Sequence, residues 1–338
     1  MMFKLTIALT QSTFAFFNNE KFDIEVIIRC IKNTTLKDMN IDEINKYEFF
    51  ANDIENFARG NSGTIKKPQQ ERSKVQSKKY RNCEIIDFHS DENENLCDIP
   101  WDHLPTSLKL LSLKFTAVIT VSSDIKRLKN LYYFTVFSKY LNHIAWEEDI
   151  SAEIESLWVK TESNLNIIKL NDKEKLNFLA VESPKLVEFN GLDAPVSLTL
   201  LTLDNCELQK FDLMNNFQNL KKLSLNNNEI SEIQWETLPL SLEKISFSNN
   251  KLKFIGNISH LQQLKEFNAR SNEIECISES ITTLQNLKDF ILSSNKLSSL
   301  PNGFENLQNL GVFVLASNKF EMIYIKIYGS DYHHIYIA

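Results

Sequence analysis

Apolar residues return in one fixed order along most of the chain. Counting Leu220 as position 0, apolar side chains stand at +3, +5, +10 and +13, and an asparagine, Asn228, stands at +8. The same frame restarts at Leu242 and Leu264, each 22 residues on, and then at Leu287 and Leu310, each 23 residues on. Side chains at +3 and +5 point to the same side of a strand, so each repeat predicts one short strand with an apolar face.

The frame continues upstream of Leu220 in a degraded form. The repeat that starts at Leu198 keeps the apolar positions and carries a cysteine in the asparagine slot. Further registers start at the apolar residues Leu176, Ile154, Leu131 and Leu108. An eleventh candidate, which starts at Cys83, is weak. The pattern therefore predicts about ten repeats of 22–23 residues over residues 83–325, followed by a C-terminal tail over residues 326–338.

This frame, LxxLxLxxNxLxxL, is the leucine-rich repeat consensus, which also accepts cysteine in the asparagine slot. The predicted fold class is α/β: a leucine-rich repeat solenoid, or horseshoe, with a parallel sheet on its concave side. A single repeat cannot bury its own apolar face, so the stability of the array is expected to come from the stacking of neighbours. Pro184 occupies the asparagine slot of the Leu176 repeat, where an irregularity is expected because proline lacks an amide.

The +8 residues are expected to have a structural role. An asparagine amide can donate to and accept from the backbone of adjacent turns, where buried polar groups need partners. The slot thus predicts a ladder along the solenoid rather than a ligand site. Its members are Cys206, Asn228, Asn250, Asn272, Asn295 and Asn318.

Side chains at +2, +4 and +6 are expected to face solvent on the concave side, where a protein partner would bind. Aromatic residues gather there in the N-terminal half and polar or charged residues in the middle, and clustered exposed aromatics are typical of interfaces. Two other interpretations remain open: a shifted register would place the aromatics in the core, and Ile291, Val312 and Val314 could be covered by the tail or by further repeats. The predicted partner-binding residues are Tyr133, Phe137, Trp158, Phe178, Lys222, Asn226, Lys244 and Arg270.

The N-terminal part lacks the repeat. Residues 3–9, 22–30 and 63–67 have strand-like patterns, and residues 47–59 have helical spacing, which predicts a small α+β module over residues 1–68. A linker over residues 69–82 follows. It belongs to a stretch at 66–81 with seven basic residues, which is read as a solvated linker or as a nuclear-import-like or anion-binding patch.

Composition narrows the possible functions. The net charge of −7 argues against direct nucleic-acid binding, and the chain has only 7 glycines and lacks both GxGxxG and GxxxxGK[ST], the loops that cradle phosphates. Its 5 cysteines show no CxxC pair, which favours a reducing compartment. The 6 histidines lack metal-ligand spacing. We therefore expect no enzyme activity, cofactor, metal site, signal peptide or membrane span.

Specific stretches resemble the leucine-rich repeat protein 1 family, the substrate receptors of cullin-2 RING ubiquitin ligases. FKLTIAL (3–9), DIEVIIRC (23–30) and FFANDIENFARGNSGTIKKP (49–68) resemble that family's small pleckstrin-homology-like domain. The segments at 194–230 and 287–321 resemble its first and last clear repeats. The chain departs from the family in its extra degenerate repeats over 83–190 and in ending without a box that docks elongin C and the cullin.

The resemblance implies an intracellular, protein-binding subunit of a cullin-RING E3 ubiquitin ligase, found in the nucleus or cytoplasm. Its partners would be elongin C, cullin-2 and the replicative helicase, and no residue would do chemistry. The alternative from the repeats alone is a scaffold of the phosphatase-regulator type, which also has repeats near 22 residues. A secreted recognition protein is a third possibility.

Overall fold

The structure is a computed structural model, and it describes residues 85–89, 99, 101–144, 153–167, 170, 174–189, 194–211, 217–320 and 334–336. The chain divides into two units, Met1–Phe49 and Phe50–Ala338. All described residues belong to the second unit. The predicted pleckstrin-homology-like module and the basic linker lie outside the described residues.

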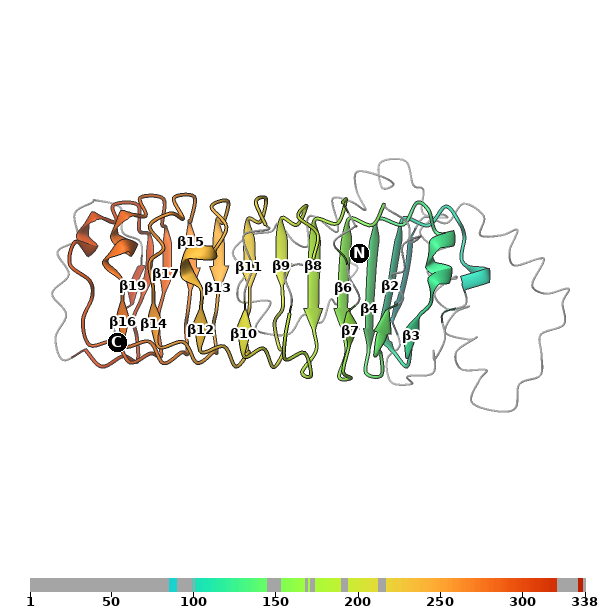
Figure 1. Cartoon of the computed structure of the whole chain (residues 1–338), viewed down its shortest axis with the longest axis horizontal. Coiled ribbons are helices and arrows are strands. Elements are labelled where there is room, and N and C mark those ends of the chain that lie inside the picture. The colour runs from blue at the N-terminus through green and yellow to red at the C-terminus, as the bar shows by residue number, and fades with distance from the viewer. Residues whose placement is uncertain are drawn as a thin grey trace, which may run out of the picture. The chain divides into compact units, whose positions relative to one another are not determined.

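A single parallel sheet organises the described part of the chain (Figure 1). It contains twelve strands in the order β1-β2-β4-β6-β8-β9-β11-β13-β15-β17-β18-β19. Every pairing within it is parallel. The strands are β1 (Ile85–His89), β2 (Leu110–Thr116), β4 (Tyr133–Ser138), β6 (Ser156–Lys160), β8 (Phe178–Glu182), β9 (Leu200–Thr202), β11 (Lys222–Ser224), β13 (Lys244–Ser246), β15 (Glu266–Asn268), β17 (Asp289–Ile291), β18 (Val312–Val314) and β19 (His334–Tyr336).

Each predicted register supplies one strand of this sheet. Strands β2 to β18 start two residues after the ten predicted repeat starts, and β1 occupies the place of the weak eleventh candidate. The prediction of a leucine-rich-repeat-type parallel solenoid is therefore confirmed. The twelfth strand, β19, comes from the predicted tail and extends the sheet at the edge of β18. Residues 334–336 thus add one more parallel strand at that edge.

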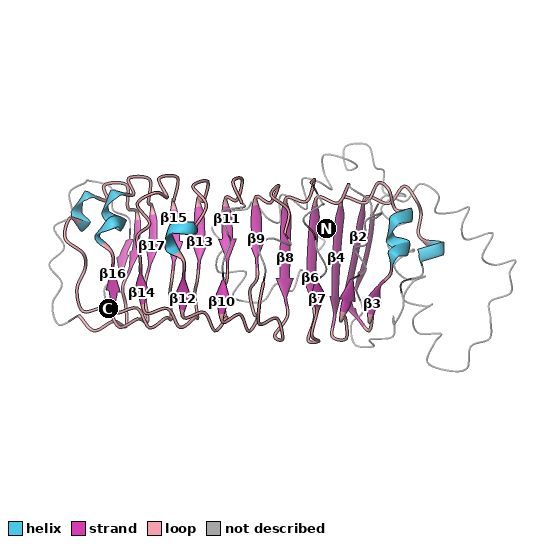
Figure 2. Cartoon of the chain, viewed as in Figure 1, coloured by secondary structure: helices cyan, strands magenta, loops and turns pink. Residues whose placement is uncertain are grey.

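The opposite side of the solenoid carries short strands and 3-10 turns (Figure 2). Three small parallel sheets lie there, β3-β5-β7, β10-β12 and β14-β16. Their strands are β3 (Thr120–Val121), β5 (His143–Ile144), β7 (Asn166–Ile167), β10 (Lys210–Phe211), β12 (Glu232–Ile233), β14 (Phe254–Ile255) and β16 (Cys276–Ile277). The helical elements are η2 (Trp101–His103), η3 (Ser123–Arg127), η5 (Trp235–Thr237), η6 (Glu279–Thr283) and η7 (Phe304–Asn306).

The α/β assignment needs a correction, because the described helical elements are all 3-10 turns of three to five residues. Repeats of 22–23 residues spend most of their length on two strands and two turns. The remainder is too short for an α-helix of ordinary length. A register shift occurs in the β2–β4 pairing, between Leu113 and Thr116, whereas β8 pairs in continuous register with both neighbours. Pro184 lies after the end of β8, so the irregularity expected there stays a prediction.

The core lies between the two sides and is continuous along the array. Leucines at +3 and +5, such as Leu223 and Leu225, are fully buried. Four phenylalanine rings at +3 or +5 form a row of stacked and edge-on contacts. Neighbouring centroids lie 6.2 Å apart for Phe247–Phe267, 5.6 Å for Phe267–Phe290 and 5.9 Å for Phe290–Phe313. Aromatic pairs at these distances stabilise a core beyond their buried area, so the row ties four consecutive repeats together.

Trp235 extends this core on the side of the 3-10 turns. Its ring lies 5.8 Å from that of Phe247 and packs directly on the backbone of Gly256. A Cβ atom at Gly256 would lie 2.3 Å from the indole Cδ1, which is too close for any other residue to fit without displacing the ring. Glycine at this point is thus required by the close approach of the indole.

In the last six repeats, a residue shortly after the sheet strand adopts a left-handed backbone conformation. At position +7, φ lies between 54° and 60° in six consecutive repeats, at Asn205, Asn227, Asn249, Ser271, Ser294 and Ser317. Asparagine tolerates this region better than most residues with a side chain. Asparagine or serine at +7 was therefore a signal for a turn, and our sequence analysis missed it.

The +8 side chains connect consecutive repeats through the backbone. Asn228 Nδ2 donates to the carbonyl oxygen of Leu203 in the preceding repeat at 2.7 Å and to that of Leu225 in its own repeat at 3.0 Å. Its Oδ1 accepts from the Leu208 N–H at 3.1 Å. The same bonds recur at the four asparagines that follow in the slot, Asn250, Asn272, Asn295 and Asn318. Cys206, the first member, places its Sγ 3.6 Å from the Val181 carbonyl oxygen.

Candidate binding face of the sheet

The +2, +4 and +6 side chains leave the twelve-stranded sheet on the side turned away from the core, which we call the outer sheet face. The alternation is clearest in β6, where Leu157 and Val159 are buried in the core while Ser156, Trp158 and Lys160 are partly exposed on the other side. This is the face that the sequence analysis expected to be concave and to bind a partner.

Aromatic side chains gather on the outer sheet face over β4, β6 and β8. We call Tyr133, Phe137, Trp158 and Phe178 the aromatic surface. The Phe137 and Trp158 rings meet edge to face, with centroids 5.0 Å apart and an interplanar angle of 76°. Tyr133, Trp158 and Phe178 are partly exposed, whereas Phe137 is only 6% exposed and supports the indole. The surface thus presents apolar rings to solvent on a rigid parallel sheet.

The Trp158 indole is held by packing rather than by hydrogen bonds. Its Nε1 is buried and has no hydrogen-bond partner among the described residues. A buried unpaired donor costs free energy. The ring's place against Phe137 is therefore set by its apolar contacts, which leave part of the indole open on the outer sheet face.

Next to the aromatic surface, over β9 to β13, the outer sheet face is polar, and its buried polar groups hydrogen-bond to one another. The fully buried carboxylate of Asp204 accepts from Ser224 Oγ and from the Asn226 backbone N–H, both at 2.7 Å, through Oδ1. Asn226 Nδ2 donates to Asp204 Oδ2 at 3.2 Å and to Ser224 Oγ at 2.8 Å. Asn226 Oδ1 accepts from Ser246 Oγ at 2.6 Å and from the Ser248 backbone N–H at 2.8 Å.

This geometry changes the interpretation of Asn226. Its side chain was expected to project toward a partner, but it is only 2% exposed and its amide makes four hydrogen bonds, three of them to neighbouring repeats. An amide has two donors and one acceptor oxygen, so little capacity is left for a ligand. Asn226 is therefore a structural connector between repeats in this face.

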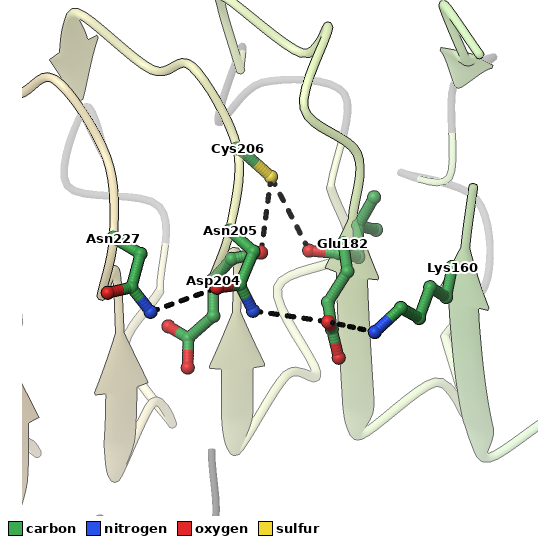
Figure 3. A network of polar contacts seen from close by, with 7 residues as sticks. Lys160, Glu182, Asp204, Asn205, Cys206 and Asn227 are labelled. Atoms are coloured by element: carbon green, nitrogen blue, oxygen red, sulfur yellow. Dashed lines mark hydrogen bonds and ion pairs between the residues drawn. The ribbon is translucent and has the colours of Figure 1, made fainter. Parts of the chain in front are cut away.

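A second chain of polar contacts joins Lys160, Glu182, Asn205 and Asn227 (Figure 3). Lys160 Nζ donates to Glu182 Oε2 at 3.0 Å, and Asn205 Nδ2 donates to the same oxygen at 3.1 Å. Asn227 Nδ2 then donates to Asn205 Oδ1 at 2.9 Å, and Asn249 Nδ2 donates to Asn227 Oδ1 at 2.8 Å. The left-handed +7 asparagines thus form a ladder of their own, which begins at the buried Glu182 carboxylate.

Burial changes the acidity of two groups in this region. It raises the pKa of the Asp204 carboxyl to about 7, although the hydrogen bonds from Ser224 and Asn226 act in the opposite direction. Burial also raises the pKa of the Cys206 thiol to about 12, which makes it a poor nucleophile at neutral pH. Sequence reasoning missed Asp204 and Glu182, because only stacking of the repeats brings these +6 acids into a closed network.

The outer sheet face opens again over β15 to β18. Lys244 is 8% exposed and forms an ion pair with Glu266 at 2.7 Å. Asp289 pairs in register with Glu266 on one side and with Val312 on the other. Ile291, Val312 and Val314 are partly exposed around it. Burial and the neighbouring Glu266 carboxylate raise the pKa of the Asp289 carboxyl above its usual value.

The eight predicted partner-binding residues divide into two groups. Phe137, Asn226 and Lys244 are buried, which differs from the expectation that the whole concave row faces solvent. The other five are at least partly exposed on the outer sheet face: Tyr133, Trp158, Phe178, Lys222 and Arg270. Partner binding by these residues stays a prediction.

Within the described ranges, no cluster of three or more histidine, cysteine or acidic residues could hold a metal ion. None of the helices among those same residues is long and apolar enough to cross a membrane.

Comparisons with known proteins support the fold. No protein-family model matches the chain, and no curated protein matches it in sequence. The solved structure of an internalin from Listeria monocytogenes superposes with a TM-score of 0.51 at 18% identity, over 80% of this chain and 82% of that one. Listeria monocytogenes InlP gives 0.50 at 17% identity over 62% of each chain. TLR13, in a complex with ssRNA13, gives 0.50 at 16% identity over 72% of this chain and 40% of that one.

At these identities the likeness shows the leucine-rich repeat solenoid and nothing finer. The chain is a leucine-rich-repeat-type solenoid protein, and no specific family is shown.

Proposed function

We propose that this protein is a non-catalytic scaffold that binds a partner protein on its outer sheet face, with the aromatic surface as the main contact. The observation that carries the proposal is the group of partly exposed aromatic rings, Tyr133, Trp158 and Phe178, gathered on neighbouring strands of one sheet face. Tryptophan and tyrosine supply a large share of binding energy at protein interfaces. The rigid sheet lowers the entropy cost of binding, because the rings are already placed.

The middle of the face supports this choice of contact. Over β9 to β13, the hydrogen-bonding groups of Asp204, Ser224, Asn226 and Ser246 are used within the sheet. A partner gains little from groups that are already paired. Specific recognition is therefore expected where apolar or unpaired groups are open, first of all at the aromatic surface.

The test is the double substitution Trp158→Ala with Phe178→Ala in the full-length chain. Affinity purification with mass spectrometry should show at least a tenfold loss of the main captured protein, which corresponds to about 1.4 kcal/mol or more. Tyr140→Ala is the matched control, since Tyr140 is an exposed aromatic outside the outer sheet face rows. Circular dichroism should show an intact fold in both variants. Unchanged capture by a folded double variant would contradict the proposal.

The finer assignment concerns the kind of partner. The resemblance to cullin-2 substrate receptors supports a ubiquitin-ligase subunit in the nucleus or cytoplasm, with elongin C, cullin-2 and the replicative helicase as partners. The repeat length equally suits a scaffold of the phosphatase-regulator type. The same purification separates them: elongin and cullin subunits would support the first assignment, and a phosphatase catalytic subunit as the main partner would contradict it. Imaging of a tagged full-length chain tests the location.

A further inference from the structure

Asp289 is an unusual carboxylate on the outer sheet face. No hydrogen bond or ion pair within the described residues reaches its carboxylate oxygens, although its backbone N–H donates to the Lys265 carbonyl oxygen at 3.0 Å. Its register neighbour Glu266 is engaged by Lys244 at 2.7 Å. Among the described residues, Asp289 therefore has no direct ion-pair partner beside a second carboxylate that Lys244 already engages. Burial and Glu266 raise the pKa of its carboxyl, and the positive charges of Lys244 and Lys288 lower it.

The surroundings of Asp289 are apolar on the other side. Val312 is its register partner on β18, while Ile291 lies two residues further along β17 and pairs with Val314. All three are partly exposed. A lysine or arginine side chain fits such a place, because its methylene stem can cover the aliphatic residues while its charged end meets the carboxylate. A neutral or acidic group would leave the half-buried charge uncompensated.

The outer sheet face thus has open recognition groups at two ends and a closed middle. The aromatic surface lies over β4 to β8, and the patch formed by Asp289, Ile291, Val312 and Val314, which we call the Asp289 patch, lies over β17 and β18. Between them lie small side chains such as Ser224 and Ser246, whose hydroxyl groups are bonded within the sheet, together with the partly exposed Lys222 of β11. A ligand that crosses this middle can lie close to the sheet without needing a particular side chain there.

We propose that the outer sheet face holds one extended segment of a partner protein by two anchors. An aromatic or large aliphatic side chain of that segment packs on the aromatic surface, and a lysine or arginine pairs with Asp289 in the Asp289 patch. This inference rests on the proposed function, and it adds the chemistry and the spacing of the two anchors.

The sheet geometry sets that spacing. From β6 to β17 the sheet order gives six strand-to-strand steps. At about 4.8 Å a step, the anchors lie roughly 29 Å apart. An extended chain rises about 3.3 Å per residue, so the two anchor residues of the segment are about nine positions apart. With two anchors on one segment, neither contact needs to be strong alone, because the second contact forms at high effective concentration.

A displayed library of random 14-residue peptides, selected on the immobilised full-length protein, tests the inference. Selected peptides should combine an aromatic or large aliphatic residue with a lysine or arginine about eight to ten positions away. Asp289→Asn should weaken a selected peptide about tenfold, as expected for a charge-assisted contact, and should remove the preference for a basic residue in a repeated selection. Glu305→Gln is the control, because Glu305 is an exposed acid at the same end of the solenoid but in η7.

The outcomes separate the inference from the function it rests on. If Trp158→Ala with Phe178→Ala abolishes peptide binding while Asp289→Asn has no effect, the two-anchor inference is wrong and the aromatic surface stands. Peptides that lack a basic residue, or in which its position relative to the apolar residue varies freely, also overturn it. A library that yields no binder to the wild-type chain counts against both. Binding of a fluorescent single-stranded RNA oligomer that Asp289→Asn strengthens would show that the face takes an anion instead.

Discussion

At the scale of single residues, the outer sheet face shows how burial changes the meaning of a polar side chain. Asn226 and Asp204 stand at the same +6 position of consecutive repeats. The backbone N–H and the side-chain amide of Asn226 both donate to the Asp204 carboxylate. Asn228, two residues later, bonds to the backbone instead. Three consecutive asparagines thus have three separate structural roles, in the buried network, in the left-handed turn and in the +8 ladder.

The raised pKa of Asp204 makes the stability of the fold depend on pH. Its folded-state pKa of about 7 lies above the ordinary value of 3.8, so the folded state binds the proton more tightly than the unfolded chain does. The contribution of this group to stability is therefore greatest below pH 3.8, falls as the pH rises, and reaches its minimum above pH 7.

Asp204→Asn should remove this dependence. From pH 5 to pH 8, the unfolding free energy of the wild-type protein should fall by roughly 3 kcal/mol relative to that of the variant, because asparagine carries no charge to bury. Urea unfolding at both pH values measures the difference. Asp102→Asn, at an exposed site, is the control and should follow wild type at both values. A variant that loses stability equally at pH 5 and pH 8 would show that Asp204 is already ionised at pH 5 in the folded chain.

At the scale of elements, a repeat consists of one strand, one left-handed turn and a segment that leads the chain to the opposite side of the solenoid. The +8 side chain connects these parts to the preceding repeat. The asparagine reaches back to a carbonyl 25 or 26 residues earlier. It therefore satisfies backbone groups of two repeats at once. Short strands of three residues, such as β11 or β13, can stand in a sheet because their ends are held in this way.

Asn250→Ala should be costly for this reason. The change removes bonds from Nδ2 to the Leu225 and Phe247 carbonyl oxygens and leaves the buried Ile230 N–H without its acceptor. We expect a loss of about 2–4 kcal/mol in unfolding free energy by chemical denaturation. Asn302→Ala removes an exposed asparagine that bonds to Glu279, and it should cost about 0.5 kcal/mol or less. Equal effects of the two substitutions would argue against a stabilising ladder.

At the scale of the whole solenoid, stability is a property of stacking. The phenylalanine row over β13 to β18 and the leucines beside it form one continuous core, in which each repeat contacts its neighbours. In such an array, a local defect weakens the interfaces next to it more than distant ones. The aromatic surface and the Asp289 patch are positioned by different repeats of the same sheet, so their spacing depends on the repeats between them.

Phe267→Ala tests this coupling. Removing a fully buried ring in the middle of the row should cost about 3–5 kcal/mol. Hydrogen exchange followed by mass spectrometry should show the largest loss of protection over β13 to β17 and a much smaller loss over β2 to β6. Phe254→Ala, at an exposed ring, is the control and should leave exchange unchanged. Uniform loss of protection along the array would mean that the solenoid unfolds as a single unit.

The sequence by itself determined the period, the register and the core. Alternation within a strand is a local property, so Leu223 and Leu225 could be assigned to the core, and ten strands could be located, from spacing alone. Asparagine or serine at +7 in each of the last six repeats was a further local signal, for a left-handed turn, that the sequence analysis did not use.

Only the tertiary structure decided which outer sheet face residues are open. Contacts such as Asp204 with Asn226, or Lys244 with Glu266, join residues 22 apart in the chain and arise from stacking. Their strength depends on which residue the neighbouring repeat supplies, and no single-repeat pattern contains that information. The same reason explains why Asn226 and Lys244 are buried, and why Asp289 is left with its charge unpaired among the described residues.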